Sequence, residues 1–336
     1  MNKFILSISI AFIFSFYSIF SQTINNNTIT TIAFGSCNLA KKPQAYFKSV
    51  LKNKPDLWIW LGDIVYANTE DANITRQKYD KVKNHKNYQS VLKSCKVIGV
   101  YDDHDFGENN IGKEYKEKHE SQQAVLDFLD EPANSERRKQ EGVYWSYTFG
   151  SGKTQIKIIL LDLRYFREMP SDTSDMLGDS QWKWLEKELA TSTATINIIG
   201  SSVQFISNQQ FFERWGAFPK AKQRLINLLE KYPSKNTFII SGDRHMAEIS
   251  KETDLKLNYT LFDFTSSGLT HFAPYTHKDK NPYRFGKEFI WKRNFGILTF
   301  NWKDQSMIMT IKKHNNKTLQ TTKLSLVNFN EIPKAK

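Results

Sequence analysis

Cysteine is scarce in this sequence of 336 residues, which contains only Cys37 and Cys95. A framework of several disulfides is therefore excluded as the main source of stability. The 15 glycines and nine prolines are too few for a fibrous or low-complexity protein, and no repeat period indicates a solenoid or a propeller. After Ser21, no apolar run approaches the ~20 residues that a membrane-spanning helix needs. These absences leave a globular protein.

The composition is that of a chain with a sizeable core. Hydrophobic residues make up 40% of the sequence and aromatic residues 14%, and a chain of this length can bury most of its apolar surface. We therefore expect one α/β domain. The 47 lysines and arginines exceed the 35 aspartates and glutamates, which gives a net charge of +12. A basic surface concentrates anionic partners such as phosphates, nucleic acid or acidic polymers, without selecting among them.

Residues 1–22 predict a secretory signal peptide. Lys3 precedes an apolar stretch, Ile5 to Phe20, that is short for a membrane span, and Ser21 offers a small residue for cleavage. An uncleaved membrane anchor is the alternative interpretation. With the signal peptide removed, residues 23–336 are expected to form a secreted or periplasmic monomer without a stable membrane span.

The two cysteines have two interpretations in an oxidising compartment. They could form a disulfide, Cys37 to Cys95, which a secreted location favours. Alternatively, Cys37 faces a ligand, because it lies in a Gly-Ser-Cys turn directly after a predicted strand.

Short apolar runs rich in β-branched residues alternate with helical patterns. The runs predict strands covered on both faces at 31–34, 57–61, 97–101, 156–161, 196–199 and 238–240. Helices are predicted from Pro43 to Leu51, over 114–129, over 179–189 with Asp179 as N-cap, and over 220–229. Only strands follow residue 255, at 261–264, 295–302, 307–311 and 321–326. This order predicts a layered α/β sandwich closed by late strands, and no linker marks a second domain.

The irregular stretch 269–288 is rich in Pro, His, Lys and Tyr. We predict a long surface loop there, and such loops in a folded domain are often functional.

Polar residues follow nearly every predicted core strand at its carboxyl end. In open α/β sheets, ligands bind in the crevice outside these ends. Carboxylates, imidazoles, a thiol, a phenol and guanidinium groups gathered there predict a metal site that faces an anion. In chain order the groups are Gly35-Ser36-Cys37; Gly62-Asp63 with Tyr66; Asp102-Asp103-His104-Asp105 with Asn109; Asp162 with Arg164; Ser201, Ser202 and Gln204; and Gly242-Asp243-Arg244-His245.

Each of these groups has a plainer interpretation when taken alone. Asp102 to Asp105 place three carboxylates in four residues, which repel one another unless cations or hydrogen bonds compensate them; a solvated acidic turn is the alternative. Asp243 to His245 could be a salt bridge beside a core histidine. Their shared position at strand ends favours the joint hypothesis of a metal site.

The motifs, taken in order, resemble those of a known family. Gly-Ser-Cys, Gly-Asp-x-x-Tyr, Asp-Asp-His-Asp followed by Asn, Leu-Asp-x-Arg and Ser-Gly-Asp-Arg-His, between Cys37 and His245, are similar to the motifs of the alkaline phosphatase D (PhoD-like) family. Its members are metal-dependent phosphodiesterases of the calcineurin-like metallophosphatase superfamily. The resemblance implies a single-domain, four-layer αββα sandwich with a ferric ion and calcium at the strand ends.

When the functional residues of the family are assigned to the matching positions of this sequence, the resemblance implies two sets of metal ligands and two catalytic residues. Ferric iron, Fe(3+), is expected on Cys37, Asp63, Tyr66 and His245, since thiolate and phenolate suit it. Asp63 would bridge to calcium, Ca(2+), or another divalent metal, with oxygen ligands from Asp103, Asp243, Asn109 and Gln204. Arg164 would grip a phosphate oxygen and His104 would face the leaving oxygen. Cys95 is then left as a buried structural thiol.

The favoured hypothesis is a secreted phosphodiesterase or alkaline phosphatase that hydrolyses phosphate esters with a metal-activated hydroxide. Nucleic acid and phospholipid are both possible substrates. One rival is a basic binding module for nucleic acid or an anionic polymer, in which the acidic strand ends hold structural calcium. A second rival is a metal-free hydrolase that uses paired acids such as Asp102 and Asp105.

Overall fold

The computed structural model describes residues 23–25, 27–233, 236–273, 280–286 and 289–330, so the predicted signal peptide lies outside the described residues. One sheet has seven strands in the order β1-β5-β6-β7-β8-β10-β9. Its strands are β1 (Thr23–Asn25), β5 (Trp145–Phe149), β6 (Ile156–Leu160), β7 (Ile196–Ser201), β8 (Thr237–Ser241), β9 (Ala247–Glu252) and β10 (Leu261–Ser266). β6, β7 and β8 are parallel neighbours, so their carboxyl ends lie at the same edge.

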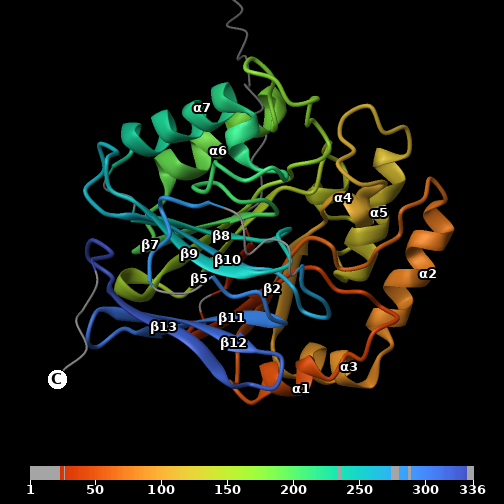
Figure 1. Ribbon diagram of the computed structural model, residues 1–336, viewed down its shortest axis with the longest axis horizontal. Helices are drawn as coiled ribbons and strands as arrows, with labels where there is room; N and C mark the ends of the chain where they lie inside the picture. The colour runs from red at the N-terminus through yellow and green to blue at the C-terminus, as the bar shows by residue number, and fades with distance from the viewer. Residues whose placement is uncertain (1–22, 26, 234–235, 274–279, 287–288, 331–336) are drawn as a thin grey trace, which may run out of the picture.

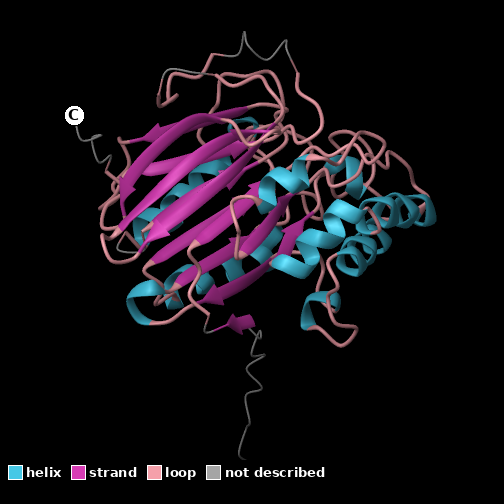
Figure 2. Ribbon diagram, turned by 90° about the horizontal axis from the view of Figure 1, so that it is seen from below, coloured by secondary structure: helices cyan, strands magenta, loops and turns pink. Residues whose placement is uncertain are grey.

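A second sheet has six strands in the order β13-β12-β11-β2-β3-β4. Its strands are β2 (Thr31–Gly35), β3 (Leu57–Leu61), β4 (Lys96–Val100), β11 (Asn294–Asn301), β12 (Ser306–Lys313) and β13 (Thr318–Ser325). β2, β3 and β4 are parallel, whereas β11, β12 and β13 extend the sheet in an antiparallel meander. Figure 2 shows the strands of the two sheets running in a similar direction.

Helices cover the outer faces of both sheets, which gives the layer order αββα (Figure 1). On the seven-stranded sheet lie α6 (Gly178–Thr191) and α7 (Pro219–Lys231). The six-stranded sheet is covered by α1 (Tyr46–Leu51) and α3 (Lys86–Ser94), with α2 (Ala72–Lys83), α4 (Asp103–Phe106) and α5 (Lys118–Phe128) at its side. Short 3₁₀ turns are η1 (Glu136–Arg138), η2 (Gly152–Thr154) and η3 (Trp215–Ala217). The predicted four-layer sandwich is confirmed.

An aromatic cluster fixes α1, α3 and α5 to the six-stranded sheet. Trp58 and Trp60 are two residues apart on β3, so their side chains lie on the same face of the sheet. Phe47 of α1 packs edge-on against both rings. Trp60 Nε1 donates to the hydroxyl of Tyr88 on α3 at 3.0 Å, and Tyr88 stacks on Phe128 of α5. Replacing either tryptophan by alanine would cost about 3–5 kcal/mol of unfolding free energy. All five aromatic side chains are buried and belong to the core.

Several element boundaries differ from the sequence expectations. α1 begins at Tyr46, so Pro43 is not in its first turn, and Leu177 is the N-cap of α6, with Asp179 in its first turn. Six α-helices and strands were not predicted from the sequence: α2, α3, α4, β1, β5 and β9. The buried side chains of α2 are Thr75, Tyr79 and Val82, a stripe too narrow and too polar to stand out as helical periodicity.

The carboxyl ends of the parallel strands in one sheet lie next to the carboxyl ends of the parallel strands in the other sheet. A Cβ atom on Gly242, after β8, would lie 2.6 Å from the carbonyl oxygen of Leu61 at the end of β3 and 2.9 Å from that of Ser202 after β7. Only glycine allows backbones from both sheets to approach so closely. The polar residues that follow the strands of both sheets therefore share one crevice. Within the described residues, no helix has both the length and the apolar character needed to cross a membrane.

Candidate active site

Four of the predicted ligands occupy an unusual backbone conformation. Cys37, Asp63, Asp243 and His245 have φ angles of 61°, 49°, 64° and 54°, in the left-handed region that residues with a side chain seldom adopt. Each lies within a few residues of the end of a parallel strand. Such conformations persist only where the surroundings impose them, and they concentrate at functional sites. Here the tight turns aim all four side chains into the crevice.

The thiol, phenol and imidazole predicted to bind iron are in contact. Cys37 Sγ lies 3.3 Å from Asp63 Oδ2, to which the Tyr66 hydroxyl donates at 3.0 Å. The same hydroxyl lies 2.8 Å from His245 Nε2. Ser267 Oγ holds both ends of the group, since it is 3.0 Å from Cys37 Sγ and accepts from the backbone N–H of His245 at 2.8 Å. The structure thus brings four different donor atoms to one point.

Four carboxylates form the adjoining part of the site. Oxygen atoms of Asp63, Asp102, Asp103 and Asp243 all lie within 4.8 Å of one another, and only Asp243 is more than marginally exposed. Burial and the neighbouring carboxylates raise the pKa of Asp63 well above its usual range, and burial together with Asp103 raises the pKa of Asp243 to about 7. Asp63 Oδ1 is buried and has no hydrogen-bond partner within the described chain.

This donor set fits two metal ions. Cations would remove the repulsion among the carboxylates and would satisfy the orphaned oxygen of Asp63, which lies in every one of the possible ligand groups. One group is Cys37, Asp63 and His245, a mixed sulfur, oxygen and nitrogen set. The others contain only oxygen donors or add His104, so the two halves of the site differ in chemistry.

His271 belongs to the site although the ligand prediction omitted it. Its Nε2 lies 3.2 Å from the Tyr66 hydroxyl and 3.2 Å from His245 Nε2. Burial lowers the pKa of His245 to about 3 and that of His271 to about 4, so both rings are neutral, the form that binds metals. The available signal was the histidine content of the predicted loop 269–288, whose residues 274–279 and 287–288 are not described.

His104 lines the crevice at the start of α4. Its Nδ1 lies 2.6 Å from Asn68 Oδ1, and its backbone N–H donates to Asp103 Oδ1 at 2.9 Å. The ring packs against Tyr66, with centroids 4.3 Å apart. Because Asn68 accepts from Nδ1 in this arrangement, Nε2 is the ring nitrogen left for a ligand or a substrate.

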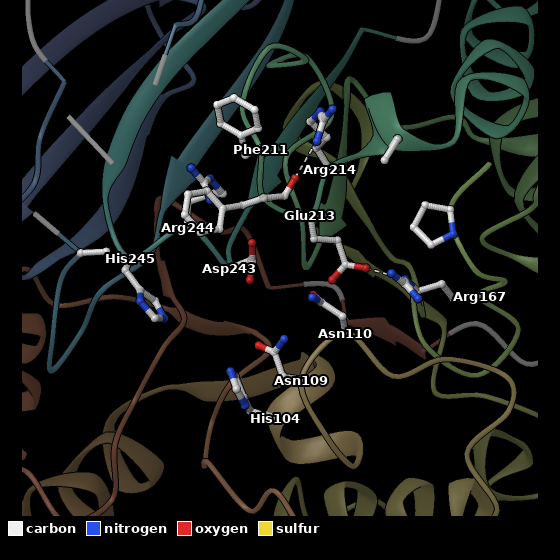
Figure 3. Close-up of a pocket in the computed structure, with 14 residues that line it drawn as sticks. His104, Asn109, Asn110, Arg167, Phe211, Glu213, Arg214, Asp243, Arg244 and His245 are labelled. Carbon is white, nitrogen blue, oxygen red and sulfur yellow. Dashed lines mark hydrogen bonds and ion pairs between the residues drawn. The ribbon is translucent and has the colours of Figure 1, made fainter. Parts of the chain in front are cut away.

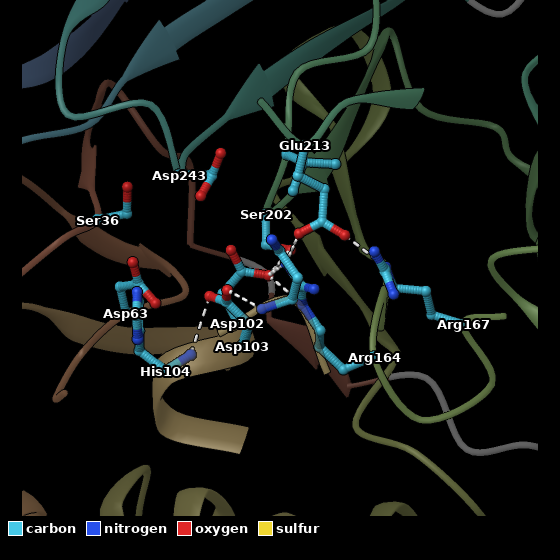
Figure 4. Close-up of polar contacts among 12 residues, drawn as sticks. Ser36, Asp63, Asp102, Asp103, His104, Arg164, Arg167, Ser202, Glu213 and Asp243 are labelled. Carbon is cyan, nitrogen blue, oxygen red and sulfur yellow. Dashed lines mark hydrogen bonds and ion pairs between the residues drawn. The ribbon is translucent and has the colours of Figure 1, made fainter. Parts of the chain in front are cut away.

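Arg164 is placed differently from the sequence expectation. Its side chain is completely buried, with Nε donating to Asp102 Oδ1 at 2.6 Å and Nη2 lying 2.5 Å from Glu213 Oε2. Ser202 also donates to Asp102, and Arg167 pairs with the other oxygen of Glu213 (Figure 4). Arg164 therefore binds the carboxylates of Asp102 and Glu213 and does not line the pocket.

A pocket of about 610 Å³ adjoins the group of four carboxylates at Asp243, which lines it (Figure 3). His104, Asn109, Asp243 and His245 lie on its inner side, which places these four predicted residues together. Its wall carries three arginines, Arg167, Arg214 and Arg244. A pocket that adjoins the carboxylate group at Asp243 and has a guanidinium wall suits a phosphate group held between bound cations and arginines.

Gln204 does not line the pocket. Its amide nitrogen donates to Glu248 and Thr265, both at 2.8 Å, while its side-chain oxygen is buried and has no hydrogen-bond partner in the described chain. Cys37 and Cys95 are both free thiols, so the disulfide interpretation is wrong. Cys95 is only partly buried, against the expectation of a buried thiol.

Solved structures of phosphatases share this fold. A structure of PhoD covers 93% of this chain with a TM-score of 0.73 at 18% sequence identity, and the chain covers 73% of it. A dimetal phosphatase from Danio rerio covers 90% of the chain with a TM-score of 0.57 at 13% identity, and all of that structure is matched. GAP50, the anchor in the inner membrane complex of Plasmodium, has a TM-score of 0.61 at 12% identity, with 90% of each chain covered. The chain therefore shares the fold of these structures.

Sequence comparison assigns the chain to one family. Residues 32–294 match the PhoD-like phosphatase family, and the chain belongs to it. Alkaline phosphatase D of Bacillus subtilis (strain 168) is 26% identical over 275 residues, which cover 64% of this chain. The match spans 46% of the length of that relative, or about half.

The buried position of Arg164 generates a prediction. Arg164→Lys should lower the free energy of unfolding by roughly 1–3 kcal/mol, because one ammonium group cannot span Asp102 and Glu213 as the guanidinium does. Urea denaturation measures the loss. Arg76→Lys, which alters partly exposed pairs with Glu120 and Asp127, is the matched control and should change stability by less than about 0.5 kcal/mol because solvent screens these pairs. Equal small losses in both variants would contradict the bridging role.

Proposed function

We propose that this protein is a metal-dependent phosphoric ester hydrolase, a phosphodiesterase or alkaline phosphatase. The observation that carries the proposal is the group of four carboxylates within 4.8 Å, joined through Asp63 to a thiol and an imidazole, which adjoins at Asp243 a pocket lined by three arginines. Membership of the PhoD-like phosphatase family supports it. A binding module with structural calcium would have no need for the thiol, phenol and imidazole groups beside the carboxylates.

The donor types divide between two metals. Cys37, Tyr66 and His245 with Asp63 would hold Fe(3+), and His271 is close enough to join them. Asp63, Asp103 and Asp243 would hold Ca(2+) or another divalent ion, with Asn109 beside them on the pocket wall. Gln204 stays a candidate ligand of this set, because its side-chain oxygen is buried without a hydrogen-bond partner in the described chain, although its amide nitrogen is engaged by Glu248 and Thr265. When bound, such metals supply a nucleophile at neutral pH and neutralise charge on the phosphate oxygens.

The arginines on the wall would bind and orient the phosphate. Arg244 follows Asp243 directly and lines the pocket, and its guanidinium is held over the Phe212 ring at 4.3 Å. A guanidinium fixed in this way can donate two hydrogen bonds to phosphate oxygens. We therefore assign the phosphate contact to Arg244 in place of Arg164. Arg164 is instead a positioning residue for Asp102 and Glu213.

His104 would protonate the leaving group. Asn68 fixes Nδ1, so Nε2 can carry a proton to the leaving oxygen. Burial lowers the pKa of His104, while the adjacent Asp103 raises it. A phosphate bound next to the ring acts in the same direction as Asp103, since its negative charge favours the imidazolium that a general acid requires.

Export would bring the site to phosphate esters outside the cytoplasm. This part of the proposal rests on the sequence of residues 1–22. The net charge of +12 favours anionic substrates, including nucleic acid and phospholipid.

The native protein should contain iron and absorb visible light, because thiolate and phenolate bound to Fe(3+) give charge-transfer bands. Metal analysis and the visible spectrum of purified protein check this. Tyr66→Phe should keep the fold, shift or weaken the band and lower the iron content. An enzyme that is colourless, free of iron and fully active would reject the assignment of Cys37 and Tyr66.

Asp63→Asn should abolish turnover while the chain stays folded, since the neutral amide removes a negative charge from the position shared by both groups of donors. The measurements are the rate of hydrolysis of bis(p-nitrophenyl) phosphate, the metal content and the circular dichroism spectrum. Near-normal activity at full metal content would remove Asp63 from the site, whereas activity that survives complete chelation would favour a metal-free hydrolase.

His104→Ala should slow the hydrolysis of alkyl phosphate esters by about 10²- to 10⁴-fold and of nitrophenyl esters much less, because only a poor leaving group needs a proton. The measurement is kcat/KM for both ester types on parent and variant of known metal content. Asn68→Ala should show the same pattern in weaker form. Equal losses for both esters together with loss of one metal equivalent would make His104 a ligand instead.

A further inference from the structure

A phenylalanine stands exposed at the mouth of the pocket. Phe211 lines the pocket, yet 96% of its surface is accessible to solvent. It lies on segment 207–214, which connects β7 to η3 and which we call the rim segment. Figure 3 shows the ring at the end of the pocket opposite His104, beyond Arg244 and Arg214.

The rim segment is fixed on both sides of this ring. Arg214 clasps the segment, because its Nε donates to the carbonyl of Asn208 at 3.1 Å and its Nη1 donates to that of Phe212 at 2.8 Å. Gln210 is buried directly before Phe211, and Glu213 is tied to Arg164 and Arg167 two residues after it.

The base of the segment is equally well held. The backbone N–H of Trp215 donates to the carbonyl of Gln204 at 3.0 Å, and the Trp215 indole donates to Ser201 at 3.1 Å. Arg244 lies over the Phe212 ring at 4.3 Å. The exposure of Phe211 is therefore a consequence of how the segment is built, since its neighbours on both sides are anchored.

We propose that Phe211 is a specificity residue that stacks on a flat aromatic ring in the part of the substrate retained on phosphorus after hydrolysis. The inference rests on the proposed function, which places the phosphate over the carboxylates and the leaving group next to His104. A ring attached to the other ester oxygen then extends toward the opposite end of the pocket, where Phe211 stands (Figure 3). A nucleobase and a simple aryl group offer this same chemistry.

The surroundings of Phe211 favour a ring over an acyl chain. A long chain needs a continuous apolar groove, but among the 14 described residues that line the pocket the apolar ones are Pro170, Phe211, Phe212, Ala217 and Ala273. A single exposed aromatic face suffices for stacking, which accepts any flat ring. Arginines beside the ring add attraction for π systems and for the phosphate.

The test holds the leaving group constant and varies the retained group. Thymidine 5′-(p-nitrophenyl phosphate), bis(p-nitrophenyl) phosphate and methyl p-nitrophenyl phosphate all release p-nitrophenolate. The parent should prefer both ring-bearing esters to the methyl ester in kcat/KM. Phe211→Ala should reduce that preference by roughly 5- to 100-fold, mainly through KM. Phe211→Trp should preserve it, and Phe211→Leu, which keeps apolar bulk without a ring, should not.

The control is Val327→Ala, which removes part of an exposed apolar side chain (66% accessible) that does not line the pocket. It should leave all three rates unchanged. A preference that survives Phe211→Ala, or a Phe211→Leu variant as selective as the parent, would overturn the stacking role. A preference for the thymidine ester over the bis(nitrophenyl) ester would identify a nucleobase as the ring, and the reverse would identify an aryl group.

A binding measurement separates failure of this inference from failure of the proposed function. If the parent hydrolyses neither the three diesters nor the monoester p-nitrophenyl phosphate, the proposed function fails. Calorimetry on metal-loaded protein then compares thymidine 5′-monophosphate with inorganic phosphate. Tighter binding of the nucleotide by at least 5-fold, lost in Phe211→Ala, would support the rim segment as a ring-binding site. Equal affinities of the parent for both ligands would overturn it.

Discussion

The convergence of four carboxylates where two sheets end is the constraint on which the site depends. Asp63, Asp102, Asp103 and Asp243 come within 4.8 Å of one another in surroundings that exclude most water. Carboxylates at such distances cannot all remain charged unless cations compensate them. Arg164 supplies one positive charge from within the chain, and it is bound to Asp102 alone among these four. Bound metals and the arginines of the pocket wall would supply the positive charge that the other three carboxylates need.

Bringing these groups together requires strained backbone conformations. Left-handed φ angles at Cys37, Asp63, Asp243 and His245 hold each side chain just beyond a strand end. Gly242 allows the two sheets to approach where a side chain would collide with Leu61 and Ser202. The strain is borne by the hydrogen-bonded sheets, whose strands are buried on both faces. Rigid strands thus position a site whose own conformation is unfavourable.

Sequence reasoning located the site because strand ends can be read from apolar runs. Cys37, Asp63, Tyr66, Asp103, Asp243 and His245 each follow a run that forms a core strand, and the structure brings them together. The contacts that each side chain makes could not be predicted as well from the sequence. Arg164 and Gln204 also follow core strands, but Glu213, Glu248 and Thr265, all distant in sequence, determine where they point. His271 escaped because it lies in a loop without periodicity. Pairing partners and loop positions arise from tertiary packing, which spacing in one sequence does not encode.

Glu213 connects the metal-binding half of the site to the mouth of the pocket. It belongs to the rim segment, and its carboxylate pairs with Arg164, which in turn holds Asp102 in the carboxylate group. Its other oxygen pairs with Arg167 on the pocket wall. The ion pairs that position the carboxylates therefore also set the height of Phe211 above them. Because the phosphate and the rest of a substrate are joined by short covalent bonds, the distance from the carboxylates to the rim determines which organic group can reach it. In the role proposed for Phe211, the same buried charges that suit the site to cations would also contribute to its choice of ester.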